Sequence, residues 1–465
     1  MESLEASDSG VAELTLGPRP PGCVVPLTAV QMRRFKLAIQ EDRLSTRMCV
    51  MAVRVLGELN VDALKSSLNS VVRRHEALRT RFARINGDLQ QLIDPPGEYS
   101  LEVVDLEQSA NDAPKEALRL AQAFVDEQID LFAEPLFAAK LIRLSPREHA
   151  LIVMLDHMVC DAVSCLILSK EIWALYEAAE KGQPCSLPKL PLQYPDYAVW
   201  QQHTYSSWLK THGAYWQQRL TGVPNAVIPS DAGATEVAQP QSAMLHLSLG
   251  HELSAKLRDF AKRQQILLPL VVLTLYATVM SHWCKQTDLL IEFLTHGRYR
   301  HPELENMIGD LASSLYLRIT VAGQDSYLDL LRKIDQEFSS AHIHHDHGQL
   351  QRTRLAAATD LTFNWLPGKA SRSSPHRAHT STNPRLHPLL IRSAFPAKFY
   401  PFFSDSAAGI GATVHFQPDR VAIGTIRQFG RYLQKTACEL IDSPSKRNTD
   451  RLARSQKAYY KYNTE

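Results

Sequence analysis

Apolar residues recur along the chain at two spacings, and each spacing predicts a different kind of element. Apolar positions three and four residues apart predict helices at 28–40, with Thr28 as N-cap, and at 61–72, with Asn60 as N-cap. The same spacing predicts further helices at 115–129, 162–181, 196–220, 252–262, 326–340 and 420–442. Short apolar runs predict strands at 48–56, 89–93, 101–105, 136–144, 149–155, 288–294, 314–320 and 411–416. These elements mix irregularly, which favours an α/β (α+β) fold of two sandwiches with antiparallel or mixed sheets.

One uncharged stretch, residues 264–284, approaches the length of a membrane span. Pro269 lies inside this stretch, and both of its ends are polar. The preceding residues 252–262 carry apolar side chains at helical spacing, so a turn at Pro269 is expected to separate two helices. The pattern therefore predicts a buried core helix and no membrane span.

Breaks in the pattern divide the chain. The first 25 residues are polar and rich in proline and glycine, and a proline-rich break follows at 184–195. Residues 369–387 contain Lys, Arg and His but no Asp or Glu, which predicts a mobile loop. The expected organisation is a flexible leader (1–25), an N-terminal lobe (26–183), a linker (184–195), a C-terminal lobe (196–445) that contains the mobile basic loop 369–387, and a polar tail (446–465).

Composition and charge narrow the class of protein. Of the 465 residues, 45% are apolar and 22% are charged, which is typical of a globular chain. The net charge of +2 argues against a protein that binds nucleic acid or another polyanion. The seven cysteines contain no C-x-x-C pair, so they indicate free buried thiols in a reducing compartment. Because the acidic N-terminus also lacks a secretory signal, we expect a cytoplasmic protein.

The segment ALIVMLDHMVCDAVSCLIL, residues 150–168, contains the most informative chemistry. An apolar strand ends at Asp156-His157, and an amphipathic helix begins a few residues later. This places the His157 imidazole at an open sheet end, near the positive terminus of a helix. Because side chains alternate along a strand, Asp156 and His157 are expected on opposite faces. The spacing of His157 and Asp161 allows both to lie on one face of a helical turn.

This segment resembles the HHxxxDG signature of condensation domains from nonribosomal peptide synthetases, within the wider chloramphenicol-acetyltransferase-like superfamily of acyltransferases. Other stretches resemble further family motifs in the family's order, and the resemblance covers roughly residues 25–445. These stretches are PLTAVQMRRF (26–35), RRHEALRTRF (73–82), QYPDYAVWQ (193–201), AYWQQRL (214–220), DLLIEFLTHGR (288–298), NMIGDLASSLYLRI (306–319) and DLTFNWLPG (360–368).

The resemblance implies two chloramphenicol-acetyltransferase-like sandwich lobes in a V shape with a central tunnel. Acyl donor and acceptor would enter from opposite ends and meet at His157, the catalytic residue. Asp161 would form a structural ion pair with Arg298, because a desolvated carboxylate beside the imidazole needs a counter-charge. The tunnel or acceptor-side candidates are Asp156, Ala162, Ser164, Ser313, Ser314, Asn364 and Trp365.

Several of these candidates depart from the family pattern. Asp156 stands where the family usually has its first His, and with Asp161 and Ser164 it resembles the signature of heterocyclization domains. Ala162 replaces the signature Gly, so its methyl group would narrow the site or select a different acceptor. Ser313 and Ser314 replace an Asn-Thr pair and are expected to alter hydrogen bonds that line the tunnel.

Two other groups of residues suggest chemistry of their own. Cys160 lies three residues from His157, which raises the question of a cysteine nucleophile. Lone cysteines at the start of a helix are mostly buried side chains that pack in the core, so a structural role is favoured for Cys160. The cluster at 341–350 contains His342, His344, His345, Asp346 and His347. Its spacing matches no closed tetrahedral set, which favours solvated or structural histidines. We therefore expect no metal site.

The resemblance implies a free-standing condensation enzyme of natural-product biosynthesis. It would transfer an acyl or aminoacyl group from the phosphopantetheine thioester of an acyl or peptidyl carrier protein, acting in trans, to an amine or hydroxyl of a small-molecule acceptor. No permanently bound cofactor is expected, and neither nucleic acid nor a membrane is expected as a partner. The alternatives are a heterocyclization-type condensation enzyme, an acyl-CoA-dependent acyltransferase, and a non-catalytic module that recruits carrier proteins or tailoring enzymes.

Overall fold

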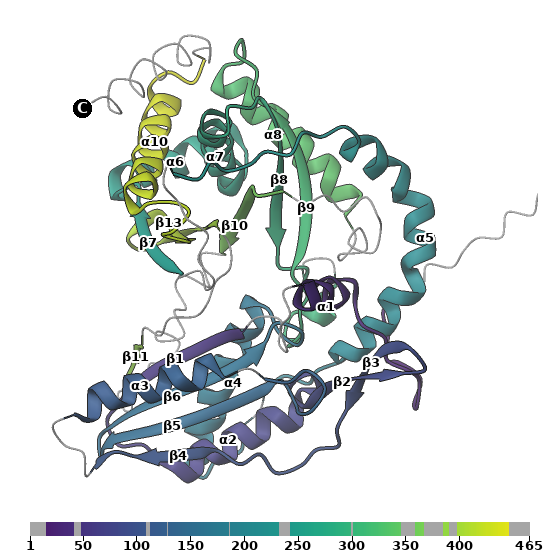
Figure 1. The fold of residues 1–465 in the computed structure, drawn as a ribbon, viewed down its shortest axis with the longest axis vertical. Helices are drawn as coiled ribbons and strands as arrows, with labels where there is room; N and C mark the ends of the chain where they lie inside the picture. The colour runs from purple at the N-terminus through teal and green to yellow at the C-terminus, as the bar shows by residue number, and fades with distance from the viewer. Residues whose placement is uncertain are drawn as a thin grey trace, which may run out of the picture.

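The strands form two large sheets, one in each half of the molecule, with helices packed on them (Figure 1). The computed structural model describes residues 15–40, 48–107, 112–127, 129–185, 187–231, 242–298, 301–345, 359–366, 385–389 and 398–445. Sheets and helices together make a mixed α/β fold, as the sequence predicts.

The first sheet has the strand order β11-β1-β6-β5-β4. Its strands are β1 (Met48–Leu56), β4 (Glu102–Asp105), β5 (Phe137–Ser145), β6 (Glu148–Asp156) and β11 (Arg385–Pro388). The antiparallel β5–β6 pair confirms the hairpin expected from the two apolar runs. Helices α2 (Val61–Arg74) and α4 (Ala162–Glu180) share an apolar core with one face of this sheet, and α3 (Ala113–Asp126) covers the other.

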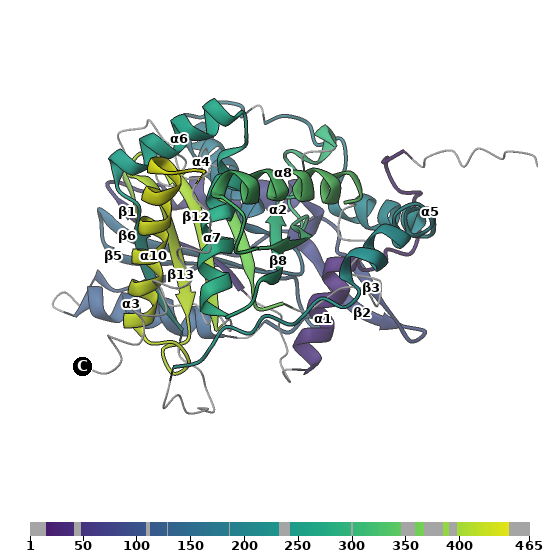
Figure 2. The ribbon, with the colours of Figure 1, turned by 90° about the horizontal axis from the view of Figure 1, so that it is seen from above.

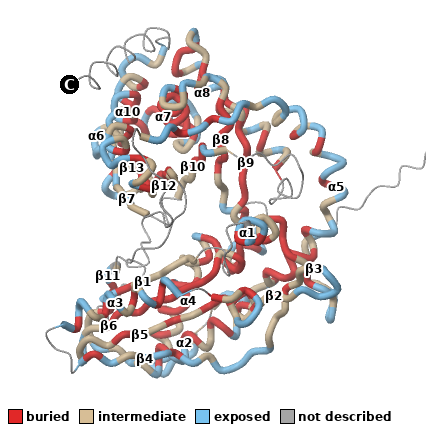
Figure 3. Tube along the Cα trace, viewed as in Figure 1, coloured by how far each residue is buried: buried red, intermediate tan, exposed pale blue. Residues whose placement is uncertain are grey.

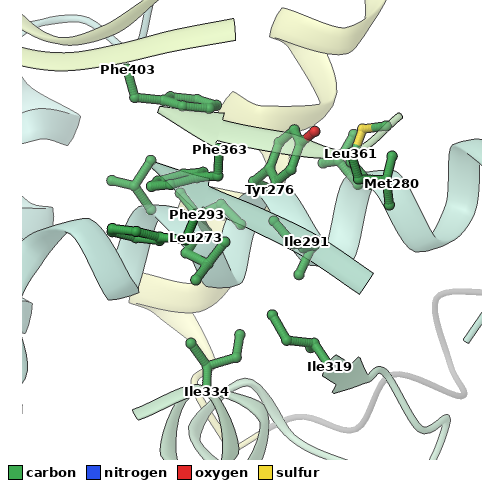
Figure 4. Packing of buried hydrophobic residues seen from close by; sticks show 14 of the residues in the cluster. Leu273, Tyr276, Met280, Ile291, Phe293, Ile319, Ile334, Leu361, Phe363 and Phe403 are labelled. Atoms are coloured by element: carbon green, nitrogen blue, oxygen red, sulfur yellow. The ribbon is translucent and has the colours of Figure 1, made fainter. Parts of the chain in front are cut away.

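The second sheet has the strand order β7-β13-β12-β10-β8-β9. Its strands are β7 (Ala243–Ser248), β8 (Asp288–Thr295), β9 (Ser313–Thr320), β10 (Thr362–Leu366), β12 (Phe399–Ser406) and β13 (Gly409–Phe416). Figure 2 shows the helices that cover it, which are α6 (His251–Gln264), α7 (Leu268–Trp283), α8 (Tyr327–Ile343) and α10 (Ile423–Asp442). Aromatic rings fill this core: the Phe363 ring lies between those of Phe293 and Phe403, at centroid distances of 5.2 and 4.8 Å (Figure 4).

The uncharged stretch at 264–284 forms the buried helix that the sequence predicts. Helix α7 begins at Leu268, with Pro269 in its first turn. The N–H groups of a first turn make no hydrogen bond within the helix, so a proline, which lacks this group, is tolerated there. Its residues 270–281 are all buried. Within the described part of the chain no single helix has the length and apolar character to cross a membrane, although α6 and α7, bent by 112°, meet that test together.

Several segments of the described chain connect the two halves. Helix α1 (Ala29–Gln40) lies between the two sheets (Figure 1). Helix α5 (Tyr194–Leu220) starts in the first apolar core and ends in the second. Residues 304–311, which we call the bridging segment, come from the second half but bury apolar side chains in the core of the first. Figure 3 shows buried residues beside α1, where the two halves meet. Because of this interlocking, residues that are far apart in the sequence are held in contact between the two halves.

Two of the segments that were expected to be flexible contain residues with defined contacts. Residues 15–25, placed in the flexible leader, contain Arg19, which forms ion pairs with Glu76 and Asp196 at 2.9 and 2.7 Å. Residues 385–387, assigned to the mobile basic loop, belong to β11, because their backbone pairs with the edge of β1. Residues 1–14, 369–384 and 446–465 lie outside the described residues.

Some internal elements also differ from the prediction. The motif RRHEALRTRF (73–82) covers the end of α2, a 3-10 turn (Glu76–Arg79) and the start of β2 (Thr80–Ile85), a strand that was not predicted and that pairs with β3 (Asp88–Ile93). Strands β7, β10 and β12 were not predicted, although FYPFFSDS in β12 alternates buried and half-buried positions. The cysteines are free as expected, but only Cys160 is fully buried, and Cys438 is exposed.

Candidate active site

His157 lies in the short turn that joins β6 to α4. Asp156 builds this turn: it is fully buried, and its Oδ1 accepts a hydrogen bond from the Met158 N–H at 2.8 Å. Asp161 is the N-cap of α4, where its carboxylate accepts the Ser164 N–H at 2.7 Å. Local hydrogen bonds on both sides of His157 therefore hold the imidazole at the end of the sheet.

The contacts of the two ring nitrogens define the state of the His157 imidazole. Nδ1 lies 2.9 Å from the carbonyl oxygen of Cys160, which can only accept, so Nδ1 carries the proton. Nε2 therefore keeps its lone pair and lies 3.2 Å from the Sγ of Cys49. The ring is half-buried. This arrangement orients the imidazole and points Nε2 at Cys49.

Asp161 and Arg298 form a buried, bidentate ion pair between the two halves. The two N–O distances are 2.7 and 3.0 Å, and both side chains are about 95% or more buried. Burial by itself would raise the pKa of Asp161, but Arg298 and the hydrogen bonds from Ser164 outweigh it, so this pKa lies below its ordinary value. Asp161 thus remains ionised and fixes the start of α4 against the second half.

Ser164 attaches the bridging segment to α4. Its hydroxyl donates to the Gly309 carbonyl at 2.9 Å and accepts from the Gly309 N–H at 3.1 Å. Arg298 also donates to the Ser164 hydroxyl at 3.1 Å, and the Leu311 N–H donates to Asp161 at 3.2 Å. Ser164 is therefore a structural member of the ion-pair network. Ala162, by contrast, is exposed at the first position of α4.

Gly297 allows the chain to bring Arg298 to Asp161. Its φ is +66°, and a Cβ at this position would lie 1.9 Å from the carbonyl oxygen of Leu311.

Replacing Gly297 with Ala is expected to lower the free energy of unfolding by about 3 kcal/mol. The alanine would have to adopt a strained φ, and the backbone at Leu311 would have to move away from its Cβ. The matched control is Gly87→Ala, which has a similar φ of +89° but no atom within 4 Å. Chemical denaturation should show that Gly87→Ala lowers the free energy of unfolding by only about 1 kcal/mol. Equal losses at both positions would contradict the steric argument.

A second buried ion pair joins α1 to the bridging segment. Arg34 Nε lies 2.5 Å from Oδ2 of Asp310, while the buried Oδ1 of Asp310 lacks a hydrogen-bond partner. Burial raises the pKa of Asp310 to about 6 in spite of Arg34. The carboxylate is thus more costly to ionise in the folded protein than in the unfolded chain.

This pKa predicts how stability depends on pH. The pKa of Asp310 is above its ordinary value of 3.8, so the folded state binds this proton more tightly than the unfolded state. The stabilisation is complete below about pH 4 and is lost as the pH rises through about 6, by about 3 kcal/mol in all. Denaturation of wild type and Asp310→Asn between pH 4 and 7 should show wild type losing stability relative to the variant as pH rises. Parallel curves would be evidence against this account.

The remaining sequence candidates lie in the second half. Ser313 Oγ is 2.7 Å from Nε2 of His345, and the Ser314 hydroxyl donates to Glu292 at 2.5 Å. Arg33 of α1 donates to the same Glu292 at 3.2 Å. Both serines are buried, so their hydroxyls hold β9 in place. Asn364 and Trp365 lie half-buried on β10.

The histidine cluster is held by contacts within the second half. His344 stacks on Tyr215 at a centroid distance of 3.9 Å, and His345 is buried against Ser313. These two histidines are therefore structural rather than solvated. Asp346 and His347 lie outside the described residues.

Cys49 is the residue beside His157 that sequence reasoning missed. It pairs with Leu155 across the β1–β6 ladder, which makes position 157 its diagonal neighbour on the same face. Only the register of two strands about 100 residues apart reveals this contact, so a pattern search along the chain does not find it.

A cavity of about 330 Å³ lies between the first sheet and α4. Apolar side chains dominate its lining, with Ser169 and Cys165 among them. The lining residues are Val50, Met51, Ala52, Val53, Leu151, Val153, Cys165, Ser169, Ile172, Trp173 and Leu389.

Comparisons with known proteins agree with this architecture. One of the linear gramicidin synthase proteins of Brevibacillus parabrevis is 32% identical over 448 residues, which are 92% of this chain and 6% of the synthase protein. This chain therefore spans a small part of that relative's length. The structure titled as the complex of the X-domain and OxyB from teicoplanin biosynthesis has a TM-score of 0.80 and 21% identity, covering 94% of this chain and 98% of that one.

A condensation domain itself gives a similar match. The first condensation domain of the calcium-dependent antibiotic synthetase, in complex with a substrate analogue, has a TM-score of 0.71 and 18% identity, covering 92% of this chain and 99% of that one. The family described as Condensation domain matches residues 23–363, about three quarters of the chain. With this match, the chain belongs to the condensation-domain family of nonribosomal peptide synthesis.

Proposed function

We propose that the protein is an acyltransferase of the condensation type, in which His157 takes a proton from the attacking amine or hydroxyl. The observation that carries this proposal is the pair of contacts made by the imidazole. Nδ1 donates to the Cys160 carbonyl, so in the neutral ring Nε2 carries the lone pair that would accept the proton at the end of the first sheet.

The reaction needs little more than orientation and one proton acceptor. The donor is a thioester, whose carbonyl carbon is already activated. The acceptor's nitrogen or oxygen forms a bond to this carbon, while its proton passes to Nε2 of His157. When the C–S bond breaks, the thiolate leaves and takes up the proton from the imidazolium. The products are an amide or an ester and the free thiol.

The Asp161–Arg298 ion pair supports this chemistry by holding His157 in position. Asp161 caps α4 four residues after His157, and Arg298 anchors that cap to the second half. We assign both residues a structural role: they hold the turn that carries the imidazole. In this proposal the two halves form the V-shaped lobes, and the two substrates approach His157 from opposite ends of a tunnel between them.

The proposed donor is an acyl or aminoacyl group on the phosphopantetheine arm of a carrier protein supplied in trans. Support comes from the family, because its members work in nonribosomal peptide synthesis. The proposed setting is free-standing and cytoplasmic, with a small-molecule acceptor. Heterocyclization, which the altered Asp156 keeps open, and acyl-CoA-dependent transfer are the variants of this chemistry.

A second function is favoured by a different observation. The X-domain of teicoplanin biosynthesis, which shares this fold, was solved as a complex with OxyB. In this chain, moreover, Cys49 Sγ is hydrogen-bonded to Nε2, the atom that would receive the proton. Both observations fit a condensation-like module that recruits carrier proteins or tailoring enzymes without turnover.

One experiment separates the two functions. The protein is mixed with carrier proteins loaded with a panel of acyl and aminoacyl thioesters and with amine or alcohol acceptors, and products are identified by mass spectrometry. Amide or ester formation supports the enzyme. Saturable carrier binding without product from any thioester would sink the enzyme and favour the recruitment module.

A further inference from the structure

Two thiols lie beside the His157 imidazole, and a third follows in α4. Cys49 comes from β1, Cys160 from the turn after β6, and Cys165 from the first turns of α4. Strand pairing and the β6–α4 turn thus gather soft sulfur ligands and a neutral imidazole from positions that are about 100 residues apart.

The distances within this group suit a metal ion. Sγ of Cys49, Nε2 of His157 and Sγ of Cys160 all lie within 4.8 Å of one another, and the Cys49–His157 distance is 3.2 Å. Zinc bonds of about 2.3 Å to sulfur and about 2.0 Å to nitrogen put tetrahedral ligand atoms about 3.5 Å apart. A small closing movement therefore brings the three atoms into zinc-binding range, with a fourth position left open.

The second shell of such a site is already present. Metal-binding histidines almost always donate their other ring N–H to a carbonyl or carboxylate, which fixes the ring and the tautomer. His157 does this through Nδ1 and the Cys160 carbonyl, at 2.9 Å. The backbone that orients Nε2 thus belongs to a residue that also offers a thiol.

We propose that Cys49, Cys160 and His157 form a zinc-binding site, and that bound zinc switches off acyl transfer by occupying Nε2 of His157. The inhibitory part rests on the proposed function, in which this lone pair accepts the acceptor's proton. Binding replaces two S–H bonds by two Zn–S bonds and releases both protons to solvent, while the neutral imidazole coordinates without losing a proton.

The binding test uses Co²⁺ as a spectroscopic probe for Zn²⁺ on the reduced, full-length protein. One equivalent of Co²⁺ per chain should produce near-ultraviolet thiolate-to-cobalt absorption, and Zn²⁺ should displace it. Cys49→Ser should weaken binding more than about 10-fold, since even second-shell losses reach that size. His157→Ala provides an independent second variant. Cys284→Ser is the matched control, because Cys284 is half-buried at the end of α7 and outside the group.

The site is overturned if excess Co²⁺ gives no thiolate absorption, or if Cys49→Ser and His157→Ala bind as wild type does. A loss of binding in Cys284→Ser would equally overturn it, since the metal would then sit elsewhere.

A measurement of product formation with and without Zn²⁺ tests the inhibition separately from the proposed function. Zn²⁺ should slow product formation by wild type and by Cys284→Ser, with full recovery after EDTA. Cys49→Ser should respond less to Zn²⁺ relative to its own zinc-free rate. Turnover that is unaffected by saturating Zn²⁺ refutes the switch while the enzyme stands. Cobalt binding without turnover from any thioester leaves the site and refutes the proposed enzyme.

Discussion

Replacement of His157 with alanine should lower the rate of product formation by about 10²–10⁴-fold, the usual contribution of a positioned acid–base group. The structural reason is that, in this proposal, the lone pair on Nε2 accepts the proton of the attacking group. Initial rates with a saturating carrier-bound thioester measure the effect. Carrier binding should be unchanged.

Two further variants distinguish a lost base from a damaged turn. Asn at position 157 has a side-chain N–H that can reach the Cys160 carbonyl, as Nδ1 does at 2.9 Å, but it lacks a basic nitrogen. His157→Asn should therefore fold like wild type and stay as slow as His157→Ala. His203→Ala, at an exposed position of α5, should keep wild-type rates. Recovery of turnover in His157→Asn would show that His157 acts only through its hydrogen bond to the turn.

Replacement of Arg298 with methionine should reduce the free energy of unfolding by about 3–5 kcal/mol, because Asp161 would remain buried without its counter-charge. The loss should be visible as an earlier midpoint in chemical denaturation. The variant Asp161→Asn/Arg298→Met should recover part of the loss, since it removes the uncompensated charge while Asn still caps α4.

A bidentate pair near the surface provides the matched control. Arg258 and Asp405 have N–O distances of 2.6 and 3.0 Å, but their side chains are 35% and 25% exposed. Arg258→Met should cost only about 1 kcal/mol or less, because water replaces the lost partner. If both arginine variants lost the same stability, burial of the Asp161–Arg298 pair would not be its source of strength.

Local signals predicted the immediate surroundings of His157 well. The apolar run 149–155, followed within a few residues by an amphipathic pattern, predicts a strand, a turn and a helix start, and the structure has β6, the turn and α4 there. These features depend on contacts between near neighbours, so they are written into a short stretch of sequence. The role of Asp156 in the turn depends on the same stretch, but its direct contact with the Met158 N–H is visible only in three dimensions.

The partners from elsewhere in the chain needed either family resemblance or the structure. The resemblance paired Asp161 with Arg298, which are 137 residues apart, and the structure has their side chains 2.7 Å apart. It did not reveal that Arg34 meets the buried Asp310, or that β11 returns from the second half to the first sheet. Residues 385–387 belong to a basic, polar stretch, so the sequence predicts a loop there. In the structure they form a strand because their backbone pairs with the edge of β1, and an apolar pattern of their own is not needed.

The sequence by itself determined most of the helices, the β5–β6 hairpin, the membership of a mixed α/β class, and the position of His157 at the end of a strand, because periodicity and capping act within a few residues. Only the tertiary structure decided what surrounds the imidazole. Cys49 reaches Nε2 through the register of β1 on β6, and the bridging segment reaches α4 through burial in the core of the other half. Register and interlocking are set by the free energy of packing over the whole molecule, so no local pattern carries them.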